Sequence, residues 1–188
     1  KIEDQLLVPK VKTEKIGEKK FPLDSTTSAN SLSLYFEYND KRYFTLLNKY
    51  LNAIYIYDYD DETLKKIVKY PVSGPGSVGK IQGYYIKNED SIFVHGKSGL
   101  RLFLSNIKGE VYREFDLSND KGYVKPSSFS VNMPITIEND FLYMNAWGHQ
   151  REYYQNSNYP ESLILKLDLK TGNSIRYGAY PSSYRNNG

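Results

Sequence analysis

The residues best suited to contact a ligand gather in one stretch of the chain. It contains the only tryptophan, together with a histidine, an arginine and two adjacent tyrosines. Aromatic faces beside guanidinium and amide donors suit a sugar ring or a peptide. A flap that fills the centre of the fold would use the same residue types, and this alternative stays open. The predicted ligand-binding residues are Trp147, His149, Arg151, Tyr153 and Tyr154, with His95 added from the matching place one repeat earlier.

An enzyme is the alternative hypothesis, and it would use carboxylates. Glu152, Asp140 and Asp90 could serve a glycan hydrolase or lyase, with His149 as a base. Asp90 and Asp140 also follow asparagines in turn-like contexts, and turn formation explains them more simply. No serine lies in a nucleophile-elbow context. Catalytic residues are therefore left unassigned, and a non-catalytic role is favoured.

Two further motifs resemble binding sites by spelling only. Residues 74–80 fit a glycine-rich phosphate loop, but strand-like residues follow where a helix should open. The carboxylates of residues 58–62 lack the glycine and glutamate spacing of an EF-hand loop. We interpret the first as a connection and the second as a hairpin turn. Cysteine is absent, so thiolate sites are excluded. We expect neither a metal nor a cofactor.

Composition narrows the class of partner. The 25 basic and 22 acidic residues are mixed along the chain, so no basic footprint for nucleic acid stands out. No apolar run approaches the roughly 20 residues that cross a bilayer. Tyrosine is unusually frequent at 19 residues. Because tyrosine favours strands, and packs its ring while its hydroxyl stays in water, we expect sheets with an amphipathic face.

The elements that position these residues repeat. Three hairpins turn through an asparagine and an acidic residue at 39–40, 88–90 and 139–140. The strands after these turns begin at Tyr43, Ser91 and Phe141, in steps of 48 and 50 residues. A second hairpin follows each, and its turn is predicted to start at Asp58, Ser105 and Asp168. Each unit therefore has four strands in about 50 residues.

This pattern predicts an all-β fold of the β-propeller type, with four-stranded antiparallel blades. About three blades fit in the chain, as a partial or open propeller. The expected division is a 1–31 N-terminal segment, a 32–72 blade, a 73–117 blade, a 118–180 blade, and a 181–188 start of a next unit or tail. Residues 20–23 could be one strand of a further blade. The 118–180 blade carries an inserted loop, 147–161, which is the stretch that holds the tryptophan.

One run carries a family resemblance. Residues 70–85, with their Gly-Pro-Gly loop and Gln-Gly-aromatic sequence, and then residues 88–93, resemble the Bacteroidetes family called domain of unknown function 4221. That family is related to six-bladed TolB-like propellers. The resemblance implies a chain about twice this length, exported to the periplasm or outer-membrane surface. The membrane contact would be a lipid on a cysteine outside this sequence. It implies no activity and no catalytic residues.

These observations lead to one functional hypothesis. We expect a non-catalytic binding or scaffolding propeller of the bacterial cell envelope, which recognises a glycan, a peptide or a partner protein through one loop face.

Overall fold

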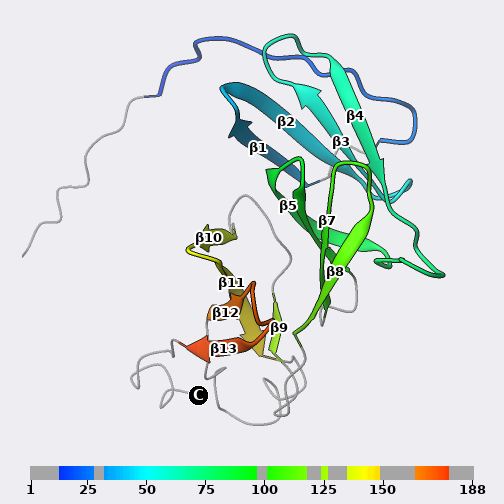
Figure 1. Cartoon of the computed structure of the whole chain (residues 1–188). Helices are drawn as coiled ribbons and strands as arrows, with labels where there is room; N and C mark the ends of the chain where they lie inside the picture. The colour runs from blue at the N-terminus through cyan, green and yellow to red at the C-terminus, as the bar shows by residue number, and fades with distance from the viewer. Residues whose placement is uncertain are drawn as a thin grey trace, which may run out of the picture.

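The computed structural model describes residues 13–27, 32–96, 101–117, 124–126, 135–148 and 164–177. Within these ranges the chain forms strands, turns and extended segments, and no helix. The strands make three antiparallel sheets of the propeller type, which follow one another in chain order (Figure 1). The predicted fold class is confirmed.

Each sheet is a blade whose strands are ordered as in the sequence. Blade 1 contains β1 (Ser33–Tyr38), β2 (Lys41–Asn48), β3 (Ala53–Asp58) and β4 (Leu64–Lys69). Blade 2 contains β5 (Ile81–Asn88), β6 (Ser91–Gly96), β7 (Arg101–Ser105) and β8 (Val111–Asp116). Blade 3 contains β10 (Thr136–Glu138), β11 (Phe141–Gly148), β12 (Ile164–Asp168) and β13 (Ser174–Tyr177). A short strand, β9 (Val124–Pro126), pairs with the far end of β11.

The first hairpin of blades 1 and 3 turns on two residues with positive φ. They are Asn39 and Asp40 in blade 1, and Asn139 and Asp140 in blade 3, with φ between 47° and 65°. Asparagine and aspartate tolerate this left-handed region better than other residues with a side chain. In blade 2 the register shifts between Ile86 and Asn88, so β5 carries one extra residue before a turn of the same length.

The second hairpin turns on a side-chain acceptor. Asp58 Oδ1 accepts the amides of Asp60 and Asp61, each at 3.0 Å, and Asp168 Oδ1 accepts the amide of Lys170 at 2.7 Å. In blade 2 the acceptor is Asn106, whose Oδ1 binds the amide of Lys108 at 2.9 Å. The prediction of Ser105 for this role is therefore wrong by one position.

The blades pack face to face through alternate residues. Between blades 1 and 2, Leu47, Ile54, Ile56 and Val68 meet Ile81, Ile86, Ile92 and Val94. Between blades 2 and 3, Phe93, Leu102 and Phe115 meet Leu142, Met144, Leu165 and Leu167. Each interface is a continuous apolar core, so the sheets are held together chiefly by burial of side-chain area.

Two buried hydroxyl pairs cross the first of these cores. Tyr84 Oη lies 2.7 Å from Thr45 Oγ1, and Tyr70 Oη lies 2.7 Å from Ser105 Oγ. All four side chains are buried. The expectation that tyrosine hydroxyls stay in water is wrong at these positions, because the hydroxyl finds its partner in the neighbouring blade.

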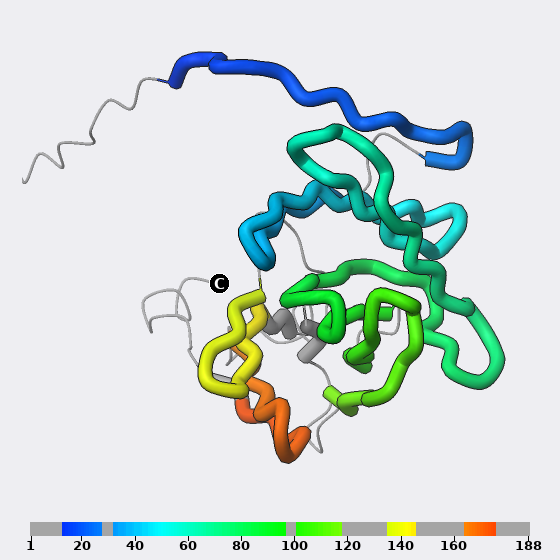
Figure 2. The backbone as a smooth tube through the Cα atoms, turned by 45° about the horizontal axis from the view of Figure 1, so that its top comes forward, coloured from blue at the N-terminus to red at the C-terminus, as the bar shows by residue number. Residues whose placement is uncertain are grey.

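Residues 13–27 lie along blade 1 without forming a strand (Figure 2). The ring of Phe21 stacks on that of Phe44, with centroids 4.4 Å apart. Tyr57 Oη donates to the carbonyl of Pro22 at 2.8 Å, and Tyr55 Oη donates to Asp24 at 2.5 Å. The segment is thus attached to blade 1 by tyrosine side chains.

Candidate functional site

The antiparallel order gives each blade two ends. At one end of the blades β2, β6 and β11 finish and β3, β7 and β12 begin, and the chain also leaves β4 and β8 there; we call this the loop end. The hairpin turns between the first two strands and between the last two lie at the other, the turn end. The predicted ligand-binding stretch begins at the loop end of blade 3.

β11 extends beyond the rest of its blade at the loop end. Its residues 141–145 pair with β12, and only residues 141–143 pair with β10. The next three residues pair instead with β9, where Trp147 lies opposite Lys125. β9 belongs to the long connection between blades 2 and 3. The start of the blade 3 insertion is therefore held against that connection, which the sequence did not reveal.

The structure locates only part of the predicted site. It places the backbone of Trp147 in β11, within the segment paired with β9. Four other predicted ligand-binding residues and one candidate acid lie outside the described residues: His149, Arg151, Tyr153, Tyr154 and Glu152. Their roles stay predictions.

His95 is buried rather than placed at an exposed rim. Its side chain is 3% exposed in β6. It stands two residues after Phe93, which packs in the core between blades 2 and 3, so both side chains point to the same face of the sheet. The alternation of β6 was the signal that could have placed His95 inside.

Two of the carboxylates proposed for catalysis, Asp90 and Asp140, lie at the turn end. Asp140 ends the β10–β11 turn, and its carboxylate is 2.6 Å from Lys170 Nζ, which raises the pKa of that lysine. Asp90 ends the β5–β6 turn, where its carbonyl accepts the Tyr112 hydroxyl. Trp147 lies seven residues after Asp140 along β11, which is about 23 Å at the rise of a strand. These acids therefore cannot share a reaction centre with residues beside Trp147.

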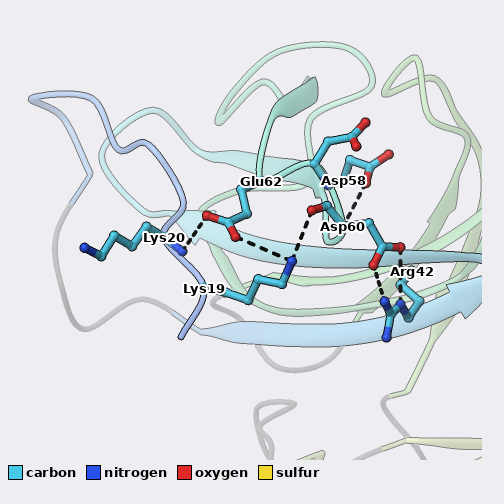
Figure 3. Close-up of polar contacts among 7 residues, drawn as sticks. Lys19, Lys20, Arg42, Asp58, Asp60 and Glu62 are labelled. Carbon is cyan, nitrogen blue, oxygen red and sulfur yellow. Dashed lines mark hydrogen bonds and ion pairs between the residues drawn. The ribbon is translucent and has the colours of Figure 1, made fainter. Parts of the chain in front are cut away.

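The acidic turn of blade 1 is occupied by protein cations (Figure 3). Lys19 Nζ lies 3.4 Å from Glu62, Arg42 pairs with Asp60, and Lys65 lies 3.6 Å from Asp61. The amide of Asp61 lowers the pKa of Asp58, and the amide of Lys20 lowers that of Glu62.

The cluster of carboxylates at this turn is therefore explained by the hairpin itself, since protein amides and cations pair with them. Among the described residues, no group of three or more histidine, aspartate or glutamate side chains is arranged to hold a metal ion.

The glycine-rich residues 74–80 connect β4 to β5, and a strand follows them instead of a helix. Asn52, from the β2–β3 loop, holds this connection. Its Nδ2 donates to the carbonyls of Tyr70 and Gly79 at 3.0 and 2.9 Å, and its Oδ1 accepts the amide of Ile81 at 2.8 Å. The connection is therefore fixed to blade 1 by one buried amide, without the helix N-terminus that would bind phosphate.

Comparisons with solved structures support the same fold. A DUF4221 member from Bacteroides vulgatus ATCC 8482 matches with a TM-score of 0.68 and 23% identity, over 84% of this chain and 46% of that one. A "Putative exported protein" from Bacteroides fragilis NCTC 9343 matches with a TM-score of 0.54 and 17% identity, over 86% of this chain and 41% of that one. This chain thus spans less than half the length of either structure.

No curated protein matches the sequence. No helix of the described residues has the length and hydropathy needed to cross a bilayer. The sequence model of the domain of unknown function DUF4221 matches residues 5–185. The chain therefore belongs to the DUF4221 family.

Proposed function

We propose that this chain is a non-catalytic binding or scaffolding part of a propeller in the bacterial cell envelope. Its ligand is a glycan, a peptide or a partner protein, and the contact surface is the loop end of blade 3. The loop residues predicted to make the contact are Trp147, His149, Arg151, Tyr153 and Tyr154.

The observation that carries this proposal is the pairing of β9 with the end of β11. It joins the longest insertion within a blade to the connection between two blades. Loops on a rigid strand scaffold are a common place for binding residues, since the scaffold sets their position while the loops vary. Here the strand scaffold extends two residues into the insertion, through Gly148, so the first residues of the loop start from a defined backbone.

The location in the envelope is supported by the family. The structure from Bacteroides fragilis carries the description of an exported protein, and the sequence resemblance implies export and a lipid anchor. A six-bladed TolB-like closure is likewise part of the proposal.

A binding role is favoured over catalysis because two of the three candidate acids, Asp90 and Asp140, serve hairpin turns at the opposite end from the insertion. A glycosidase needs its two carboxyl groups within about 10 Å of one another.

The test is ligand capture on glycan and peptide arrays. Each ligand that is captured is then titrated against the protein in solution by calorimetry. Trp147→Ala and Tyr153→Ala should each weaken binding about fivefold or more, since stacking of an aromatic ring contributes about 1 kcal/mol or more. Tyr112→Ala is the matched control, because Tyr112 is an exposed tyrosine on β8. A ligand whose affinity falls with the control and not with the loop variants would place the site elsewhere.

A further inference from the structure

We propose that residues 19–24 are the outermost strand of a blade that precedes blade 1. The three inner strands of that blade would be supplied by the same polypeptide, C-terminal to β13. The inference rests on contacts that repeat from blade to blade, and it is independent of the ligand.

The first repeated contact is made at the turn of the last hairpin. In blade 3, Arg113 of β8 donates to the carbonyl of Lys170 at 2.7 Å. In blade 1, Lys19 Nζ donates to the carbonyl of Asp60 at 3.1 Å. Lys170 and Asp60 are equivalent, because each stands two residues after the aspartate that caps its turn. Lys19 thus takes the place that the outer strand of blade 2 takes on blade 3.

The second repeated contact is made one step inward from the turn. Tyr70, next to the end of β4, bonds to Ser105 of blade 2. In blade 1 the residue equivalent to Ser105 is Tyr57, since each directly precedes the turn-capping residue. Tyr57 Oη donates to the carbonyl of Pro22.

The chain direction is also the same in both places. In blade 2 the turn residue Gly109 approaches the carbonyl of Lys69 so closely that an added Cβ would lie 2.7 Å from it, and Ser105 then meets Tyr70. In blade 1 the turn meets Lys19, and Tyr57 then meets Pro22. Residues 19–22 therefore follow the path of an outer strand and do not merely touch the blade.

The third observation concerns the face of blade 1 that points away from blade 2, and which part of it residues 19–24 cover. Phe44 and Leu46 of blade 1 occupy the positions of Ile92 and Val94, which pack against blade 1 in the core between blades. Phe21 covers Phe44 and lies edge-on to Tyr57, with centroids 5.5 Å apart. At the inner edge of the same sheet, Tyr35 of β1 is 50% exposed. The outer strands are thus covered on this face, whereas Tyr35 at the inner edge is half exposed, as expected if inner strands of the preceding blade belong there.

Pro22 indicates which edge of the segment is free. Proline in a sheet occurs at an edge because it has no amide to donate. Within an extended segment, residues 20 and 22 present their polar backbone groups to one side, and residues 21 and 23 to the other. The side of residues 20 and 22 already contacts Glu62 and Tyr57. The amides of Phe21 and Leu23 therefore point toward the missing strand.

Two facts favour the same polypeptide, C-terminal to β13, as the source of the three inner strands. The structure from Bacteroides vulgatus is about twice as long as the part that this chain covers, which leaves enough polypeptide for further strands. A second copy of this chain fits less well. Its blade 3 already has an outer strand, β13, which would compete for the place of residues 19–24.

The test is amide hydrogen exchange at Phe21 and Leu23, measured in the natural full-length polypeptide and in the 188-residue chain. In the full-length polypeptide both amides should exchange at least about 100-fold more slowly, because the hydrogen bond to the neighbouring strand must open first. Equal rates in the two samples would overturn the proposal. Protection that rises with the concentration of the 188-residue chain would assign the face to a second copy and would also overturn it.

A substitution gives a second measurement. Leu23→Pro removes an amide that the proposal pairs with the neighbouring strand, and Leu23 is 54% exposed in this chain. It should lower the Tm of the full-length polypeptide by several degrees and leave that of the 188-residue chain nearly unchanged. An equal effect on both would show that residues 19–24 act only as a strap on blade 1.

Discussion

Asn52 should be the most sensitive polar residue of blade 1, because one side chain holds three backbone groups. It is 4% exposed, and it fixes the carbonyls of Tyr70 and Gly79 and the amide of Ile81. Each bond contributes about 1 kcal/mol net, so Asn52→Ala should cost about 3 kcal/mol. Asn52 also has φ of 53°, where an alanine adds about 1 kcal/mol of strain.

The comparison with glycine separates these two contributions. Asn52→Gly removes the side-chain bonds and relieves the strain at positive φ. If the bonds dominate, glycine and alanine should both lower the Tm by about 6–12 °C, since 1 kcal/mol is about 2–4 °C for a chain of this size. The control is Asn139→Gly, an exposed turn residue with φ of 47°, which should change the Tm little.

The assay is thermal and urea unfolding followed by circular dichroism. If Asn52→Gly is as stable as the unchanged chain, the backbone conformation is what matters at this position, and the reasoning from the three bonds is refuted. A loss below about 1 kcal/mol for both variants would refute it as well.

Three further predictions follow from contacts described above. The pKa values of Asp58 and Asp168 are lowered by backbone amides, those of Asp61 and Thr171 first. The stability that these carboxylates contribute is therefore present above a pH of about 4 and is lost as the pH falls through the lowered values. Asp58→Asn and Asp168→Asn should flatten the fall of Tm on acidification, and an unchanged slope would contradict this. Gly96→Ala would place a Cβ 2.4 Å from the carbonyl of Val78 and should cost about 2 kcal/mol in urea unfolding, whereas Gly17→Ala, with no atom within 4 Å, should change little. A double-mutant cycle with Tyr70→Phe and Ser105→Ala should give a coupling free energy of about 1 kcal/mol; additivity would show that the hydroxyl pair does not join the blades.

The hairpins could be predicted because their signals are local. Asn39 with Asp40, and Asn139 with Asp140, supply positive φ where a tight turn needs it, and alternation on either side defines the strands. The same local logic failed at Ser105. The register shifts at the same place in blades 1 and 2, between Ile56 and Tyr57 and between Leu104 and Ser105. Ser105 therefore corresponds to Tyr57, and Asn106 is the turn acceptor, which sequence spacing alone does not show.

What the sequence could not show depends on distant contacts. The pairing of Trp147 with Lys125 joins two loops that have no periodic pattern of their own. The bond from Tyr57 to Pro22 spans 35 residues, and that between Tyr70 and Ser105 also spans 35. Local preference carries no information about partners so far along the chain, and the packing of one blade on the next decides them.

The hydroxyl pairs between blades 1 and 2 give the protein an internal optical probe. Burial raises the pKa of Tyr70 and of Tyr84, so both phenols keep their protons in alkaline solutions that ionise the tyrosines at the surface. The last fraction of tyrosinate absorbance to develop during a base titration would then appear only as these two sheets separate, and it would report that event without any attached label.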